Sequence, residues 1–283
     1  MTYEEMLRKC RMNLEKAGID DPDSDAWGLF EFVTGMDRTH YFLENREEMK
    51  KEEIKRLEEL EALRCERIPL QQITGYQYFY GRRFSVNEHV LIPRQDTECL
   101  VEETLKKVKS GDRVLDLCTG SGCIAVTIAK EKKVTVVGTD ISAQALEIAR
   151  KNAEDLEAEV QLAWGDLFEA VEGEFDCIVS NPPYIPAGEI AHLMPEVRDH
   201  EPISALDGSE DGLFFYRKIA QQALGFLKPG GWLLFEIGYD QGITVPEIMQ
   251  QAGLKKIEVK KDLAGHDRVV LGQRYQEEIC LIN

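Results

Sequence analysis

Four consecutive residues, Asn181, Pro182, Pro183 and Tyr184, carry the most specific chemistry in the sequence. The side-chain oxygen of Asn181 and the carbonyl oxygen of Pro182 can both accept hydrogen bonds from one NH₂ group. The two prolines restrict the backbone that aims these acceptors, and the ring of Tyr184 can stack on a planar group. The tetrad predicts a site for a planar, weakly nucleophilic nitrogen, either a side-chain amide or the exocyclic amine of a base. A Pro-rich turn after a strand would account for the prolines alone.

A glycine loop, Gly120-Ser121-Gly122, is suited to bring a ligand close to the backbone. It lies where an apolar strand pattern turns into a helical one. Glycine has no Cβ and tolerates positive φ, and the helix N-terminus offers free N–H groups. The loop lacks the third glycine of the dinucleotide fingerprint G-x-G-x-x-G. The sequence therefore favours a ligand without phosphates.

Acidic residues after the next two predicted strands suit an adenosine-like ligand. Asp140 stands 20 residues after Gly120, where a carboxylate can accept hydrogen bonds from ribose hydroxyls. The alternative role of Asp140 is that of a helix N-cap. Asp166 and Leu167 follow the third strand, where they are suited to bind the amino group and the ring of adenine.

Alternating strand and helix patterns predict an α/β domain that positions these groups. The predicted strands are 113–118, 134–139, 160–164, 175–180, 232–237, 256–260 and 268–272, and the predicted helices are 123–130, 143–153, 213–227 and 245–251. Strands separated by helices form a mainly parallel sheet covered on both faces, here with an antiparallel pair at its end. Ligands bind outside the carboxyl ends of such strands, so the tetrad should face the glycine loop.

The first 93 residues differ from the rest in hydrophobic periodicity and composition. Residues 1–70 show helical periodicity and predict a small all-helical domain, with helices over 3–14, from Asp21, near 38–43 and over 54–63. Residues 71–93 are rich in aromatic and β-branched side chains and predict a β-hairpin linker, with a turn candidate at Asn87-Glu88. Residues 94–283 form the predicted α/β domain.

Composition limits the possible partners. The 283 residues include 34 basic and 52 acidic side chains, and the resulting net charge of −18 opposes binding to nucleic acid through its phosphates. The seven cysteines form no C-x-x-C pair, so no disulfide framework and no metal site are expected. No apolar run approaches a membrane span and the N-terminus has no signal-peptide pattern, which predicts a cytoplasmic protein.

These motifs together resemble a known family. Asp116, the glycine loop, Asp140 and the tetrad are similar to those of class I S-adenosylmethionine-dependent methyltransferases that act on a planar nitrogen. Gly75, the hairpin, the segment 90–98 and the helical N-terminal domain resemble the release-factor glutamine methyltransferases (the PrmC/HemK family), over nearly the whole chain. The resemblance implies a seven-stranded Rossmann-like domain. It also implies N5-methylation of the glutamine amide in the Gly-Gly-Gln motif of class 1 peptide chain release factors, with S-adenosylhomocysteine as the second product.

The resemblance also implies roles for individual residues. The expected cofactor contacts are Asp116, Cys118, Thr119, Gly120, Ser121, Gly122, Asp140, Asp166, Leu167 and Asn181. The tetrad would bind the substrate amide, with Asn181, Pro182 and Tyr184 as the catalytic residues. Arg94 and Thr97 would lie near the cofactor. The sequence departs from the family's pattern at Cys118, where the family has Gly, and at Gln95-Asp96, where it tends to have Pro and Glu. The implied mechanism is direct displacement of the sulfonium methyl by the amide nitrogen, which needs neither metal nor covalent intermediate.

Two alternatives compete with this function. A DNA or RNA exocyclic-amine methyltransferase would carry a similar tetrad, but it should have a basic surround. Acidic residues instead follow the tetrad, at Glu189, Glu196, Asp199, Glu201, Asp207, Glu210 and Asp211. A module that senses S-adenosylmethionine without turnover would leave the tetrad with no task. The expected partner is a release factor, with no membrane and no direct nucleic-acid contact, and residues 1–70 are expected to hold that protein substrate.

Overall fold

The computed structural model describes residues 1–275, which form two compact units. The helical unit comprises Met1–Tyr76 and Met194–His200, and the sheet unit comprises Gln77–Leu193 and the described residues from Glu201 onward. Within residues 1–275, no helix is long and apolar enough to cross a membrane. The six cysteines up to Cys177 are free thiols, and Cys280 lies outside the described residues.

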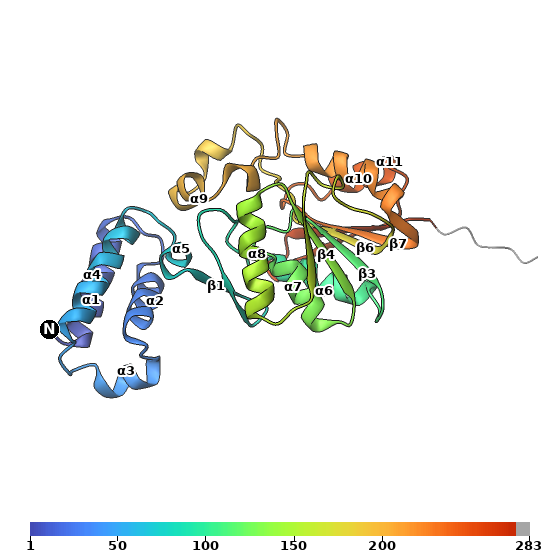
Figure 1. Cartoon of the computed structure of the whole chain (residues 1–283). Helices are drawn as coiled ribbons and strands as arrows, with labels where there is room; N and C mark the ends of the chain where they lie inside the picture. Colours follow the sequence, from blue (N-terminus) through green and yellow to red (C-terminus); the bar gives the residue numbers. More distant parts are fainter. Residues whose placement is uncertain (276–283) are drawn as a thin grey trace, which may run out of the picture. The chain divides into compact units, whose positions relative to one another are not determined.

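The helical unit contains the four helices that the periodicity predicted. Its helices are α1 (Tyr3–Lys16), α2 (Pro22–Thr34), α3 (Arg38–Glu44), α4 (Lys51–Cys65), the short α5 (Leu70–Thr74) and α9 (Pro195–His200). Helices α1, α2 and α4 pack side by side (Figure 1) around the buried side chains of Met6, Leu14, Phe30 and Leu57. The predicted start signal at Asp21 is confirmed, because its carboxylate accepts a hydrogen bond from the backbone N–H of Ser24.

Helix α9 comes from the segment after the tetrad and was not predicted. Arg64 of α4, only 5% exposed, donates hydrogen bonds to Asp25 at 2.6 Å and to Glu196 of α9 at 2.7 Å. Arg67 donates a second hydrogen bond to Glu196 at 2.8 Å. A buried charge is stable only when it is paired in this way. Glu196, expected in an acidic surround, is instead a buried anchor between α9 and α4.

The predicted hairpin exists, but it is shorter than expected. Strands β1 (Tyr76–Phe79) and β2 (Arg82–Ser85) pair in a two-stranded sheet. The turn between them is Tyr80-Gly81, with φ of 50° and 71°, which matches the positive φ values of a two-residue hairpin turn. The candidate turn at Asn87-Glu88 is a separate turn after β2, where the Val90 N–H donates a hydrogen bond to the Asn87 carbonyl at 3.4 Å. Residues 70–74 form α5 rather than extended chain.

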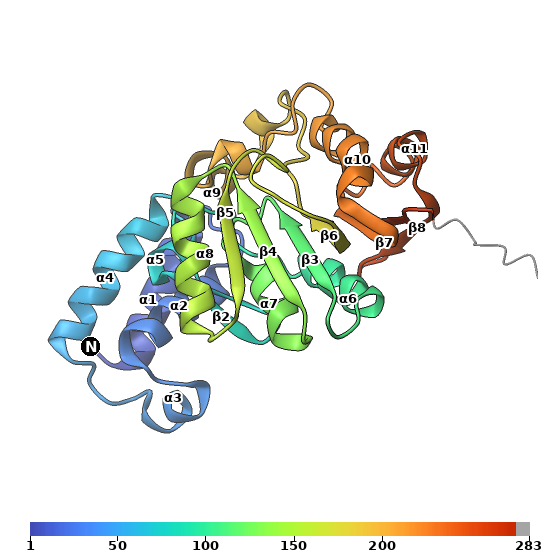
Figure 2. The same cartoon turned by 45° about the vertical axis from the view of Figure 1, so that its right-hand side comes forward.

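The sheet unit is built on a seven-stranded sheet with the order β5-β4-β3-β6-β7-β9-β8. Its strands are β3 (Arg113–Leu117), β4 (Thr135–Asp140), β5 (Val160–Trp164), β6 (Phe175–Ser180), β7 (Leu227–Glu236), β8 (Lys255–Lys261) and β9 (Asp267–Gln273). Strands β5, β4, β3, β6 and β7 run parallel to one another. Strand β9 runs antiparallel to both of its neighbours, β7 and β8, so the sheet ends in an antiparallel pair, as predicted. Figure 2 shows β5, β4, β3 and β6 side by side. Residues 228–231 lie within β7 at a register shift against β6.

Helices cover both faces of this sheet. Helices α6 (Thr97–Lys107), α7 (Cys123–Glu131) and α8 (Ala143–Asp155) pack on the face that carries Val114, Val136 and Val179. Helices α10 (Phe214–Phe226) and α11 (Thr244–Gln251) cover the face that carries Leu115 and Ile178. Consecutive strand residues point to opposite faces, so each apolar strand supplies both layers. Helix α6 and the short 3₁₀ turns at Ile190–His192 and Ile203–Ala205 were not predicted.

The turn after β3 adopts left-handed backbone angles at three positions. Gly120 and Gly122 have φ of 55° and 77°, which glycine tolerates without strain. Cys118 has φ of 60°, although its Cβ clashes with the backbone in this region. The strain explains why glycine would suit this position. It does not prevent the turn from forming, because the surrounding sheet fixes the backbone.

Two variants that both remove the thiol isolate this strain. We expect Cys118→Gly to be more stable than Cys118→Ala by about 1 kcal/mol, because only alanine keeps the Cβ in the left-handed region. At an ordinary strand position glycine would be the less stable by roughly 0.5–1 kcal/mol. Urea unfolding followed by circular dichroism measures both free energies. An alanine variant as stable as the glycine variant would show that Cys118 is not strained.

Candidate active site

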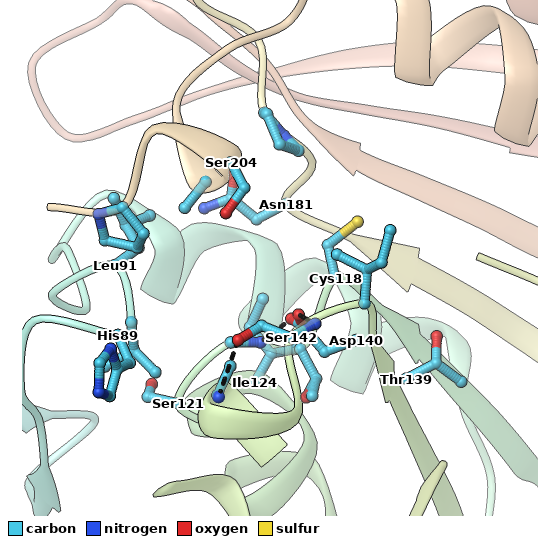
Figure 3. Close-up of a pocket in the computed structure, with 18 of the residues that line it drawn as sticks. His89, Leu91, Cys118, Ser121, Ile124, Thr139, Asp140, Ser142, Asn181 and Ser204 are labelled. Carbon is cyan, nitrogen blue, oxygen red and sulfur yellow. Dashed lines mark hydrogen bonds between the residues drawn. The ribbon is translucent and has the colours of Figure 1, made fainter. Parts of the chain in front are cut away.

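A cavity of about 450 Å³ opens at the carboxyl edge of the sheet unit (Figure 3). The predicted cofactor residues that line it are Cys118, Thr119, Gly120, Ser121, Asp140, Asp166, Leu167 and Asn181. Pro183 of the tetrad also lines it, as do Arg94 and Thr97. Four predicted residues, Asp116, Gly122, Pro182 and Tyr184, do not line the cavity. Figure 3 shows Asn181 and Ser204 on one side of the cavity, and Asp140 and Ser142 on the other.

Strand register brings the key groups to one level. Leu117 of β3 pairs with Thr139 of β4 and with Ser180 of β6. The residues that follow them in the chain, Cys118, Asp140 and Asn181, consequently emerge next to one another. The spacing of these residues in the sequence becomes an arrangement in space only through the parallel pairing of the strands.

The Asp140 carboxylate connects the glycine loop to the start of α8. Its Oδ2 accepts a hydrogen bond from the Gly120 N–H at 2.9 Å, and its Oδ1 accepts one from the Ser142 N–H at 2.8 Å. Ser142, rather than Asp140, is the N-cap of α8, because its Oγ accepts a hydrogen bond from the Ala145 N–H. Burial raises the pKa of Asp140, while the backbone N–H groups act against that shift. Each carboxylate oxygen keeps a lone pair that can accept a hydrogen bond from a hydroxyl group.

Asp116 lies behind the loop. Its Oδ2 accepts a hydrogen bond from the Thr119 hydroxyl at 2.6 Å, and within the described residues its Oδ1 has no partner. Complete burial raises the pKa of Asp116 to about 7. The residue therefore holds the shape of the loop through Thr119, which itself lines the cavity.

Asp166 and Leu167 lie at the edge of the cavity next to Thr139. Leu167 is buried with φ of 52°, and its carbonyl accepts a hydrogen bond from the Thr139 hydroxyl at 3.3 Å. The Asp166 carboxylate is paired with Lys218 of α10. Leu167 offers an apolar surface. The ion pair with Lys218 uses the Oδ2 of Asp166, so the Oδ1 can still accept a hydrogen bond from an amino group.

The tetrad divides into residues that line the cavity and residues that do not. The Asn181 Nδ2 donates a hydrogen bond to the Thr97 Oγ1 at 3.3 Å, which leaves Oδ1 as the free acceptor. Pro182 and Pro183 are buried. The Tyr184 ring packs against the core under α10, its carbonyl accepts a hydrogen bond from Gln241 at 3.2 Å, and burial raises its pKa. Only Asn181 and Pro183 of the four reach the cavity as the structure stands.

Sequence reasoning missed one wall of the cavity. Residues 202–205, which precede Asp207 in the lining, form a loop around the 3₁₀ turn Ile203–Ala205. Buried Glu201 anchors this loop, because it accepts a hydrogen bond from Arg94 at 2.6 Å. Glu201 was expected in an acidic surround, so that expectation was wrong for it as well as for Glu196. A segment rich in charged residues is normally predicted to lie on the surface. The arginine that pairs with Glu201 is 107 residues away in the sequence, and an arginine that pairs with Glu196 is 132 residues away.

The lining chemistry fits an adenosyl ligand better than a phosphorylated one. Of the residues that the structure describes, Arg94 is the single arginine in the lining and no lysine contributes to it. Arg94 is already paired with Glu201. Three carboxylates, Asp140, Asp166 and Asp207, also face the cavity. Such a surface repels phosphates and favours a ligand that carries hydroxyl groups, an amino group and positive charge. Residues 1–275 contain no group of three or more His, Cys, Asp or Glu that could hold a metal ion.

Comparisons with known proteins agree with this architecture. Family models match at residues 5–75 ("PrmC N-terminal domain") and at residues 95–195 ("Methyltransferase small domain"). The solved structure of a methyltransferase from Pyrococcus furiosus is similar with a TM-score of 0.55 and 21% identity, over 70% of this chain and 91% of that chain. At that identity the likeness shows the fold alone.

Full-length relatives are considerably more similar. A release factor glutamine methyltransferase from Geobacter sulfurreducens is 42% identical over 96% of this chain and 96% of its own length. The protein of the same name from Clostridium acetobutylicum is 40% identical over 97% of this chain and 99% of its own. The similarity includes the helical unit, the glycine loop and the tetrad within one alignment. The chain therefore belongs to the release factor glutamine methyltransferase family.

Proposed function

We propose that this enzyme transfers a methyl group from S-adenosylmethionine to the side-chain amide nitrogen of the glutamine in the Gly-Gly-Gln motif of class 1 peptide chain release factors. The observation that carries the proposal is the Oδ1 acceptor of Asn181, next to the glycine loop in a cavity whose one lining arginine within residues 1–275, Arg94, is already paired with Glu201. Family membership over nearly the full chain supports the substrate. A substrate in the translation machinery also agrees with a cytoplasmic location.

Different residues of the cavity would bind different parts of the cofactor. Asp140 would accept hydrogen bonds from the ribose hydroxyls, and Leu167 with Asp166 would bind the adenine. The turn from Cys118 to Ser121 would border the ribose and the methionine part, with Asp116 holding its shape. S-adenosylmethionine, when bound, supplies a methyl group on a positively charged sulfur, so the donor needs no further activation.

The task of the protein is then to position the amide nitrogen. The Asn181 Oδ1 would accept a hydrogen bond from the glutamine NH₂. The Pro182 carbonyl, which does not line the cavity in this structure, would have to turn toward the substrate to accept the second. An amide lone pair is delocalised, so holding both N–H bonds aims the nitrogen at the methyl group. As the N–CH₃ bond forms and the S–CH₃ bond breaks, S-adenosylhomocysteine is released and one N–H proton passes to solvent. Holding reacting atoms near attack geometry contributes roughly 7–11 kcal/mol to lowering a barrier. Tyr184 would not contact the substrate; its ring would pack against the hydrophobic core and so fix the backbone of the tetrad.

Transfer of label identifies the substrate. Purified enzyme is incubated with methyl-labelled S-adenosylmethionine and with a release factor, RNA or DNA. We expect label on the release factor and none on a release factor whose motif glutamine is replaced. Label on RNA or DNA would favour the base-amine alternative, and binding of cofactor without any transfer would favour the sensing module.

The acceptor role of Asn181 has a specific kinetic signature. We expect Asn181→Ala to lower kcat by about 10²-fold or more, the cost of losing one positioned polar group. The dissociation constant of S-adenosylhomocysteine should stay within about threefold, because Asp140 and the glycine loop are unchanged. Gln251→Ala, which removes an exposed side-chain amide on α11, is the matched control. Turnover by Asn181→Ala close to that of wild type would refute this role.

The helical unit carries a groove suited to hold the protein substrate. The groove has a volume of about 470 Å³, and its lining includes three arginines (Arg8, Arg11 and Arg38), two carboxylates (Glu4 and Asp23) and the rings of Trp27 and Tyr41. The Arg38 guanidinium lies 4.4 Å from the centre of the Trp27 ring, and Arg11 is paired with Asp23 at 3.4 Å. Arginines beside aromatic rings are typical of binding surfaces. In a chain with a net charge of −18, this groove is suited to an acidic segment of the release factor.

Loss of charge from this groove should affect substrate affinity alone. We expect Arg8→Ala/Arg38→Ala to raise KM for the release factor by about 3- to 10-fold, since exposed charges contribute up to about 1 kcal/mol each. The value of kcat and the affinity for cofactor should not change. The double variant Arg46→Ala/Arg56→Ala removes two other exposed arginines of the helical unit and serves as control. Equal KM values for the two double variants would refute a role for the groove.

A further inference from the structure

Glu236 is a buried carboxyl group that the proposed mechanism does not use. It ends β7 and is only 2% exposed. Its Oε2 has no hydrogen-bond partner within residues 1–275. Burial raises the pKa of Glu236 to about 7, and a hydrogen bond with Thr97 and the charge of Arg268 oppose that shift. A buried carboxyl group with an unused oxygen is costly, so its position calls for a physical reason.

Strand pairing places Glu236 beside Asn181. Strands β6 and β7 are parallel, and Ser180 pairs with Phe235. The next residues, Asn181 and Glu236, therefore leave the sheet at the same level on neighbouring strands. Thr97, the first residue of α6, completes the group, because its Oγ1 accepts a hydrogen bond from the Asn181 Nδ2 at 3.3 Å. The side chains of Thr97 and Asn181 both act to lower the pKa of Glu236 against the effect of burial, as polar groups beside its carboxyl group do.

The direction of the hydrogen bond from Asn181 to Thr97 has a chemical consequence. An asparagine amide turned by 180° would present NH₂ where it had presented oxygen, and NH₂ cannot accept a hydrogen bond from a substrate amide. In its ionised form the Glu236 carboxylate only accepts hydrogen bonds, and the Thr97 hydroxyl can donate to it while accepting from Asn181. Both acceptors thus attract the Nδ2 side of Asn181. The opposite orientation would set the Asn181 oxygen against an acceptor-only group.

We propose that Glu236, acting with Thr97, is a positioning residue that keeps the Oδ1 of Asn181 turned toward the substrate. This inference rests on the proposed function, which needs that oxygen as the acceptor. The surroundings of Glu236 suit a fixed position. The Tyr216 hydroxyl donates a hydrogen bond to its backbone carbonyl at 2.8 Å. Arg268 compensates its charge and pairs with Asp96 and Asp262, each at 3.1 Å.

The isosteric variant Glu236→Gln tests the direction of the network. Its carboxamide can present NH₂ to Asn181, which removes the preference for one orientation. We expect kcat for the release factor to fall about 10- to 100-fold, as for other misplaced reacting groups. The affinity for S-adenosylhomocysteine should stay within about threefold. Glu258→Gln, an exposed carboxylate on β8, makes the same chemical change away from the site and should keep the wild-type kcat.

A double-mutant cycle separates positioning from a general structural effect. If Glu236 acts through Asn181, Glu236→Gln should cause no further loss in the Asn181→Ala background. Independent, multiplicative losses would overturn the inference, and so would a wild-type kcat in Glu236→Gln. If Glu236→Gln does not fold, as judged by circular dichroism, Thr97→Val provides the same cycle. Wild-type kcat in folded Thr97→Val would then overturn it.

The two levels of the proposal fail in different ways. Wild-type enzyme that methylates the release factor, combined with an unchanged Glu236→Gln variant, overturns only the positioning role. Wild-type enzyme that leaves the release factor unlabelled overturns the proposed function and, with it, the role assigned to Glu236.

Discussion

The parallel register of four neighbouring strands is the constraint on which the site depends. Thr139, Leu117, Ser180 and Phe235 lie side by side across β4, β3, β6 and β7. The residue after each of them is therefore delivered to the same edge at the same level. A slip of one residue in any pairing would reverse the faces of that strand and move its terminal group away from the others. Apolar packing on both faces of the sheet holds this register, so the hydrophobic core determines the geometry of the polar site.

Buried polar groups at this edge are each held by directional partners. The Asp140 carboxylate accepts hydrogen bonds from two backbone N–H groups. The Asp116 carboxylate accepts one from the Thr119 hydroxyl, and the Glu201 carboxylate accepts one from the Arg94 guanidinium. Burying such groups is unfavourable unless the hydrogen bonds are made, so each one constrains the segment that supplies its partner. The glycine loop, the start of α8 and the loop at 202–205 are fixed in this way. Hydrogen bonds within the protein thus fix several walls of the cavity.

Sequence patterns predicted the helices and strands whose formation depends on residues close together in the sequence. Strand β6 was predicted at its observed bounds because its apolar run is short and ends at the tetrad. Helix α6 was missed because two of its four buried side chains, Thr97 and Thr104, are polar and weaken the apolar periodicity. Helix α9 has six residues, and its buried side chain is Glu196, which is stable there only through Arg64 and Arg67. Local pattern carries no information about such distant pairings.

The same limit applied to the candidate site. The glycine loop, Asp140 and Asn181 were recognisable because each follows a strand, and a strand end has a known place in a parallel sheet. Glu236 also ends a strand, but nothing local distinguishes its carboxylate from a solvated one. Only the neighbouring strand shows that it meets Asn181.

Specificity for a protein amide over a base amine has to arise outside the tetrad. An acceptor pair such as the Asn181 Oδ1 and the Pro182 carbonyl binds either kind of NH₂ equally well, because both nitrogens are planar and weakly basic. Net charge contributes part of the discrimination, since −18 repels a polyanion over the Debye length. It does so without recognising any particular protein. Selection among proteins therefore needs a surface that reads more than one residue, and the helical unit, with its arginine and aromatic groove, is suited to supply it.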